Sequence, residues 1–270
     1  MRSATALPDQ SIGAQLREWR ERRGRTQLDL SLDAGISTRH LSFVETGRSQ
    51  PGAEVVLALA QELDIPLREQ NKLLLAAGHA PAFPERTLAD PNLESVREAV
   101  DLILTGHEPY PALVVDRHWN VVAANTTMRA ISRLIDPVLR EPPVNAMRAG
   151  LHPRGLAQWI TNLQPVYGYF VRRLEHQVAV TADPVLVALL DEVRGYRAAP
   201  DSPHPAAEAA AGHIVTPIIQ LRGPDGTELA LFGTVASFGT ATEVTSSELS
   251  IELAFPADAT SAAVLRALSA

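Results

Sequence analysis

Cysteine is absent from the 270 residues of the chain. Its absence excludes a disulfide scaffold, a cysteine-ligated zinc site, a thiol redox switch and flavin photochemistry through a cysteine adduct. The sequence also lacks an apolar run long enough to cross a bilayer, and its first ten residues have no apolar segment typical of a signal peptide. We therefore expect a cytoplasmic protein that does not insert into membranes.

Enzyme signatures are missing as well. The sequence contains no HExxH, GxSxG, P-loop or GxGxxG motif, and its eight histidines are scattered without metal-ligand spacing on a shared helix. Acidic pairs such as Asp191-Glu192 are typical of solvated helix faces. We expect no enzymatic activity, no metal site and no required cofactor.

Charge is distributed unevenly along the chain. The formal net charge is −7, yet residues 1–80 carry ten basic and ten acidic side chains, so the whole surplus lies beyond residue 80. One face of the first part can therefore be basic, while the acidic remainder should avoid phosphate. The length and the 46% hydrophobic content predict about two domains with sizeable cores.

The stretch 26–47, TQLDLSLDAGISTRHLSFVETG, predicts two short helices joined by a tight turn. Gly35 can adopt a positive φ at the turn, Ser37 is a good N-cap for the second helix, and Gly47 follows its last turn. The outer side of that helix would carry Thr38, Arg39 and Ser42. The apolar positions that two crossing helices could share are Leu30, Ile36, Leu41 and Val44.

Several fixed spacings in this region match a known family at once. The chain resembles the XRE/phage-repressor class of helix-turn-helix domains through Thr26-Gln27, Ala34-Gly35-Ile36-Ser37, Leu41-Ser42, Glu45-Thr46-Gly47-Arg48 and Pro51. Ser31 departs from the family, which usually has alanine there.

The resemblance implies a double-stranded DNA operator as partner and assigns a role to each predicted contact. Gln27 would bind a phosphate, and Ser37 would begin the helix that enters the major groove. The alternative is a helical hairpin without a DNA role. Residues expected to face base edges are Thr38, Arg39 and Ser42, and those expected to hold the backbone are Thr46, Arg48 and Ser49.

Helical periodicity predicts that the N-terminal domain, residues 1–80, is one small all-α domain of five helices, and the resemblance implies a lambda-repressor-like fold. The further helices are expected at 11–23, 53–63 and 67–77. Four arginines at 20, 22, 23 and 25 fit either a solvated helix end or phosphate contacts. Residues 81–92 contain Pro81, Pro84 and Pro91 and predict a semi-rigid linker.

Residues 93–270 predict an α+β domain. β-rich runs are expected at 111–116 and 121–125, forming a hairpin, and at 213–221, 228–236 and 250–255, with a turn at 223–226. Helices are expected at 93–105, from 126 to about 139, and at 153–162, 163–177 and 184–195, and residues 198–212 predict a mobile loop. Hairpins at both ends with helices between them predict a PAS-like fold with roughly five antiparallel strands.

A second resemblance covers about residues 110–260. The chain is similar to the MmyB-like ligand-binding domain, which normally follows an XRE domain, and this implies a transcription regulator whose PAS-like half can hold a fatty acid. The region 196–213 is shorter than the family pattern. The matching stretches are Tyr110–Ala112, Trp119–Asn125, Asn145–Arg148, Leu151–Leu156 with Asn162, Phe238–Thr240, Thr245–Leu249 and Phe255–Asp258.

A buried carboxylate from such a ligand would need a partner. Arg148 is the predicted partner, helped by His152 or Asn125. Arg148 fits a structural ion pair equally well, and His152 is more typical of a structural hydrogen bond than of a ligand contact or a haem ligand. The side chains predicted to line the pocket, each of which also suits plain core, are Trp119, Met128, Trp159, Tyr167 and Phe170.

The sequence as a whole predicts a DNA-binding transcription regulator whose second domain binds a small apolar effector. We expect a homodimer, because one small module binds specific DNA only weakly. The alternatives are that the PAS-like domain serves only dimerisation or protein interaction, or that it is a haem or flavin sensor.

Overall fold

The computed structural model describes residues 11–196, 217–239 and 241–268. The chain divides into two compact units, described separately below. Unit 1 comprises Met1–Thr87 together with Thr240–Ser247, and unit 2 comprises Leu88–Gly239 together with Glu248–Ala270. Most of the predicted linker thus belongs to unit 1, as does the segment that joins the last two strands. No helix in the described ranges is long and apolar enough to span a membrane.

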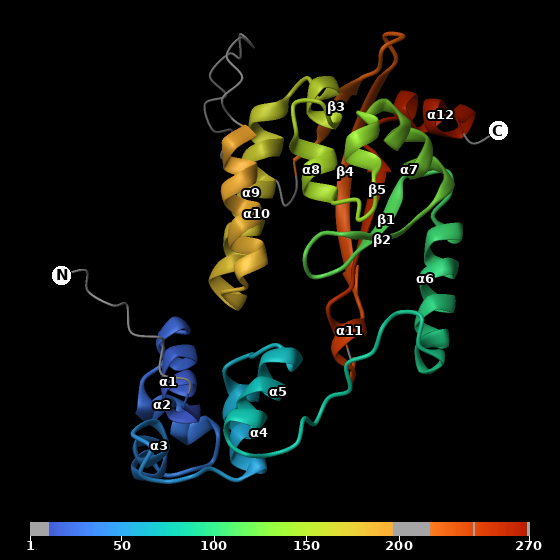
Figure 1. The fold of residues 1–270 in the computed structure, drawn as a ribbon. Helices are drawn as coiled ribbons and strands as arrows, with labels where there is room; N and C mark the ends of the chain where they lie inside the picture. The colour runs from blue at the N-terminus through green and yellow to red at the C-terminus, as the bar shows by residue number, and fades with distance from the viewer. Residues whose placement is uncertain (1–10, 197–216, 240, 269–270) are drawn as a thin grey trace. The chain divides into compact units, whose positions relative to one another are not determined.

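Unit 1 contains the five helices that the sequence predicts between residues 11 and 78 (Figure 1). Side-chain caps start three of them: Ser11, Thr26 and Ser37 each accept a hydrogen bond from a backbone N–H in the first turn. Gly35 and Gly47 have φ of 67° and 73°, which confirms the positive φ expected at the turn. The helices are α1 Ile12–Arg22, α2 Gln27–Asp33, α3 Thr38–Glu45, α4 Ala53–Glu62 and α5 Leu67–Ala76.

The core of unit 1 lies where these helices meet. Leu16, Leu30, Leu41 and Val44 are fully buried, so the face of each helix that the periodicity predicts is the face that packs. Helices α1 and α3 approach closely at Gly13, where a Cβ atom would lie 2.4 Å from the carbonyl oxygen of Val44. This close contact fixes the angle at which α3 is presented.

Unit 2 is built on a five-stranded antiparallel sheet in the order β2-β1-β5-β4-β3, which confirms the PAS-like fold. Gly223 and Gly226 form the predicted turn between β3 and β4 through a 3.0 Å backbone hydrogen bond. The predicted strand at 213–221 begins at Ile219, and residues 213–216, like the predicted loop 198–212, lie outside the described residues. The strands are β1 Ala112–Val115, β2 Val121–Ala124, β3 Ile219–Arg222, β4 Glu228–Ser237 and β5 Ser250–Pro256.

The helices of unit 2 cover both faces of this sheet (Figure 1). Helix α6 packs over β1 and β5 through Val100 and Leu104, while α8, α9 and α10 pack on the other face around Val115 and Trp119. The helices are α6 Glu94–Gly106, α7 Thr126–Ile131, α8 Ala146–Leu151, α9 Leu163–Thr181, α10 Pro184–Gly195 and α12 Ala259–Leu268, with single 3-10 turns at Pro91–Leu93, Ser132–Leu134, Pro137–Arg140 and Leu156–Trp159.

One helix prediction was wrong in position. The helix expected at 153–162 is a single turn, and the helix α8 lies before it, capped by Asn145. Pro153 disfavours a helical conformation at His152, so this Pro marks a helix end rather than a start. Gly155 then passes so close to α8 that its Cβ would meet the Ala149 carbonyl oxygen at 2.3 Å. Helix α12 was not predicted.

Candidate nucleic-acid interface and apolar cavity

The outer side of α3 carries the predicted base-reading residues. Ser37 caps the helix by accepting from the N–H of His40 at 3.1 Å. Arg39 is exposed, whereas Thr38 and Ser42 are half-buried. The hydroxyl of Thr38 lies 2.8 Å from that of Ser31, so the serine that departs from the family pattern restrains Thr38. Arg39 is therefore the side chain of these three that extends furthest from the surface.

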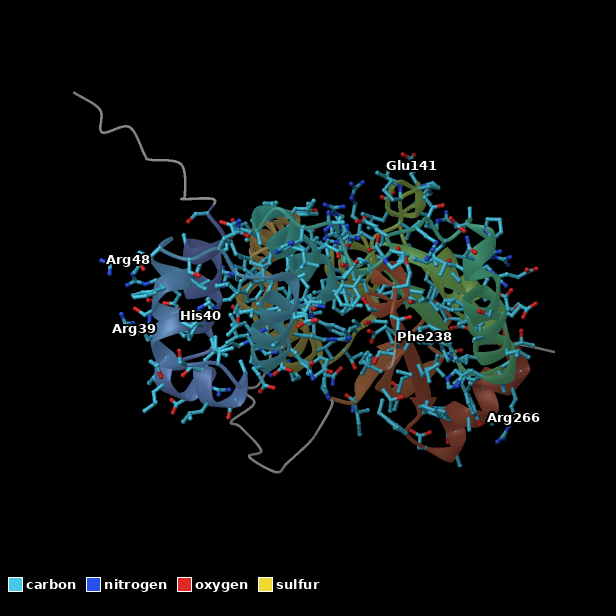
Figure 2. The ribbon with its side chains drawn as sticks, turned by 90° about the horizontal axis from the view of Figure 1, so that it is seen from below. Arg39, His40, Arg48, Glu141, Phe238 and Arg266 are labelled. Atoms are coloured by element: carbon cyan, nitrogen blue, oxygen red, sulfur yellow. The ribbon has the colours of Figure 1, made fainter. Side chains whose placement is uncertain are left out.

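Arg39 and Arg48 share one aromatic side chain. Their guanidinium groups lie 5.2 Å and 5.9 Å from the ring centroid of Phe43, and both point outward from the same end of the unit (Figure 2). Within the described residues neither guanidinium pairs with a carboxylate. Two exposed, unneutralised cations held by one ring suit the phosphates and base edges of DNA.

The residues predicted to hold the DNA backbone lie just beyond α3. The hydroxyl of Thr46 donates to the Ser42 carbonyl at 2.7 Å, and the N–H of Ser49 donates to the Phe43 carbonyl at 3.1 Å. Thr46 is exposed and Ser49 is half-buried. These contacts fix the backbone that presents Arg48.

A buried carboxylate ties three helices together at this site. Glu45 of α3, whose side chain is 3% exposed, accepts from Arg20 of α1 at 2.7 and 3.0 Å and from the amide of Gln27 at 2.8 Å. The hydrogen bond that Arg20 donates to Glu45 raises the pKa of Arg20 above its ordinary value. Sequence reasoning placed Gln27 at the DNA but missed this pair, because its partners are 25 residues apart.

The other arginines near the end of α1 are held within the unit. Arg22 pairs with Glu18, Arg25 pairs with Asp33, and Arg23 donates to the Leu63 carbonyl at 2.9 Å. These internal contacts are a third arrangement, different from the solvated helix end and from the phosphate contacts that the sequence suggested.

Unit 2 contains an apolar cavity of about 190 Å³, partly open at the surface, between the sheet and the helices α7 to α9. Three of the eight predicted pocket residues line it: Trp119, Met128 and Phe170. The lining side chains that the sequence did not predict come from four strands and from the region from α7 to α9. They include Leu113, Ile131, Met147, Leu151, Ile160, Val166, Ile219, Leu221, Leu231 and Glu252.

The other five predicted pocket residues are engaged elsewhere, outside the described lining. Asn125 caps α7 and donates to the Tyr110 carbonyl at 2.7 Å. The indole of Trp159 and the hydroxyl of Tyr167 donate to the backbone carbonyls of Leu134 and Val193. His152 accepts from the N–H of Arg154 at 3.0 Å, as its structural alternative predicted.

Arg148, the predicted carboxylate partner, lies in a surface ion pair instead. Its guanidinium donates to Glu192 at 2.7 and 2.8 Å, with the two side chains 42% and 38% exposed. The hydrogen bond from Arg148 lowers the pKa of Glu192. The correction follows from the direction of α8: its N-terminal cap faces the sheet, while position 148 faces α10.

The charged residue in the described lining is Glu252 of β5. It accepts a bidentate pair of hydrogen bonds from Arg173 of α9 at 2.6 and 2.9 Å, and the guanidinium lies 4.6 Å from the ring centroid of Trp119. The indole N–H of Trp119 donates to Gln177 at 2.7 Å.

A helix-turn-helix unit with exposed cations, followed by a PAS-like unit around an apolar cavity, defines a DNA-binding transcription regulator with a ligand-binding domain. Comparison with family models agrees. Residues 16–70 match the helix-turn-helix model, and residues 96–268 match the MmyB-like transcription regulator ligand binding domain. The chain belongs to the family of MmyB-like transcription regulators, and it is a regulator rather than an enzyme.

Curated relatives carry similar descriptions. An uncharacterized HTH-type transcriptional regulator of Mycobacterium tuberculosis is 31% identical over 132 residues, which is 47% of each chain. The match thus spans about half the length of that relative. The uncharacterized HTH-type transcriptional regulator RghRB of Bacillus subtilis is 37% identical over 110 residues, 40% of this chain and 77% of that protein. The transcriptional regulator ClgR of Mycobacterium tuberculosis is 36% identical over 81 residues, 30% of this chain and 70% of that protein.

Proposed function

We propose that unit 2 binds a small apolar effector with an acyl chain, a fatty acid or a close derivative, and that binding modulates the affinity of unit 1 for its operator. The observation that carries the proposal is the cavity, whose lining is almost wholly apolar. A water molecule finds few hydrogen-bond partners in such a space. An apolar ligand that enters it removes its apolar surface from water, and this favours binding.

The size of the cavity sets the size of the effector. Cavities of about 150 Å³ lined by apolar side chains hold benzene, so by proportion about 190 Å³ suits roughly eight carbon atoms. Each buried CH₂ contributes about 0.8 kcal/mol, a factor of about four in affinity. Affinity should therefore rise about fourfold per added carbon up to roughly eight, and level off beyond that unless the walls move.

The strands that line the cavity also lead into unit 1. Leu231 and Gly233 of β4 and Glu252 of β5 are lining residues, and the segment that connects these two strands, Thr240–Ser247, is part of unit 1. There Val244 is fully buried, and its N–H donates to the Pro84 carbonyl at 2.9 Å. A shift of β4 relative to β5 on ligand binding would therefore also move the connecting segment, which belongs to unit 1. This connection supports the proposal that the effector modulates operator binding.

In the proposed mechanism the regulator acts as a homodimer in the cytoplasm, where the effector changes the placement of two DNA-reading units over two half-sites. We propose that no cofactor is needed. Purified protein extracted with organic solvent should release an acyl compound detectable by mass spectrometry, and its addition should shift operator affinity in a gel-shift titration. A visible absorbance band from a haem or flavin in the purified protein would contradict this proposal.

A further inference from the structure

The polar groups of the cavity wall restrict the chemistry of the effector beyond its apolar body. Among the described lining residues, the side chains with a nitrogen or oxygen atom are Trp119 and Glu252. The N–H of the Trp119 indole is already donated to Gln177. The described wall therefore offers a ligand no side-chain N–H or O–H that lacks a partner.

Glu252 faces the cavity because of its register in the sheet. It lies opposite Leu113 on β1 and Val235 on β4, and paired residues of an antiparallel sheet share a face. Leu113 lines the cavity as well. The carboxylate of Glu252, whose side chain is 21% exposed, therefore stands on the face of the sheet that lines the cavity, where partial desolvation disfavours it unless it is paired.

Arg173 of α9 forms the ion pair with Glu252. It uses two N–H groups on the two oxygens of Glu252 and presents its face to the ring of Trp119, and it is not itself a lining residue. Each carboxylate oxygen keeps a lone pair beyond the one that Arg173 occupies. A molecule in the cavity thus meets oxygen acceptors, while the guanidinium lies behind them.

We propose that the effector carries an uncharged hydrogen-bond donor at its polar end, such as an alcohol or an amide, and that Glu252 receives this donor and discriminates against a free carboxylate. This inference rests on the proposed function and narrows the effector given there, a fatty acid or a close derivative, to an uncharged derivative. A carboxylate in the cavity would lie against a second carboxylate, and it would bring no donor to the wall.

The test compares two eight-carbon probes that differ only at the polar end. Binding of 1-octanol and of octanoate to the full-length protein is measured by isothermal titration calorimetry at pH 7.5, where octanoate is ionised. The wild-type protein should bind 1-octanol at least about tenfold more tightly. In Glu252→Gln the ratio should fall to within about threefold, because the amide both donates and accepts.

Glu192→Gln is the matched control, since Glu192 also accepts hydrogen bonds from two nitrogens of one arginine in unit 2 but lies outside the described lining. This control should keep the wild-type ratio. Octanoate binding as tightly as 1-octanol to the wild type, or a ratio unchanged in a folded Glu252→Gln, would overturn the role of Glu252 while leaving the apolar effector in place. Binding of neither probe would overturn the proposed effector class together with this inference.

Discussion

Replacing Glu45 with alanine should loosen unit 1 without touching its exposed surface. The carboxylate is 3% exposed and accepts three hydrogen bonds, two from Arg20 and one from Gln27. Its removal leaves the Arg20 guanidinium, 11% exposed, with the exposed carboxylate of Glu21 at 3.8 Å as its remaining counter-charge. Breaking such a pair from one side costs about 3–5 kcal/mol. We expect about 3 kcal/mol, because Arg20 keeps its hydrogen bond to the Arg25 carbonyl.

Hydrogen exchange followed by mass spectrometry is the suitable assay, because a chain with two units need not unfold in one step. Amides of α1 to α3 should exchange about a hundredfold faster in Glu45→Ala, while those of unit 2 keep their rates. Glu21→Ala is the control, since it removes an exposed carboxylate that pairs with Arg17 at 2.8 Å and contacts Arg20 only at 3.8 Å. Equal exchange in the two variants would show that the Glu45 network does not hold these helices together.

Four further outcomes follow from the same contacts. Arg39→Ala should lose about 1–3 kcal/mol of discrimination between the operator and other DNA, measured by gel shift on sequences selected from a random pool; unchanged specificity would refute its base-reading role. Gln27→Ala should weaken binding to all sequences alike, and a loss confined to the operator would count against a phosphate contact. Gly13→Ala should destabilise unit 1 by about 2 kcal/mol in denaturant titrations, because its Cβ would press on a backbone oxygen, whereas Gly52→Ala, with no neighbour within 4 Å, should change it far less. The hydrogen bond from Arg148 lowers the pKa of Glu192, so the ion pair stabilises unit 2 above the unfolded pKa near 4.5, and this stabilisation is lost as the pH falls through the lower folded pKa. Glu192→Gln should therefore flatten the dependence of unit 2 stability on pH below about pH 5. The change should be less than about 1 kcal/mol, because solvent screens this exposed pair.

Local chemistry explains why the helix-turn-helix could be predicted. The cap at Ser37 and the positive φ values at Gly35 and Gly47 each depend on residues within four positions of one another, so a short stretch of sequence contains the whole cause. The turn between β3 and β4 is local in the same way. Its glycines supply the conformation that the hairpin needs, whatever packs around it.

The candidate cavity depends on contacts between distant parts of the chain. Arg173 and Glu252 are 79 residues apart, and nothing near either one marks it as a partner of the other. Arg148, the expected carboxylate partner, is basic and ends a stretch that matches the MmyB-like family. The direction of α8 nevertheless turns its side chain toward Glu192 on α10. Only the register of β5 decides that position 252 faces inward.

The hydrogen bond between Gln27 and Glu45 connects the stability of unit 1 with the predicted contact of Gln27 to a DNA phosphate. A glutamine amide has two N–H groups, and Glu45 occupies one of them at 2.8 Å, which leaves the second for a phosphate. Because Glu45 is itself held by Arg20, the amide is oriented before DNA arrives, and less rotamer entropy remains to be lost on binding. Glu45→Ala should therefore weaken DNA binding through Gln27 even under conditions where unit 1 stays folded. Adding Gln27→Ala to that variant should then cost less than it costs in the wild-type protein, and full additivity of the two losses would show that the carboxylate does not orient the amide.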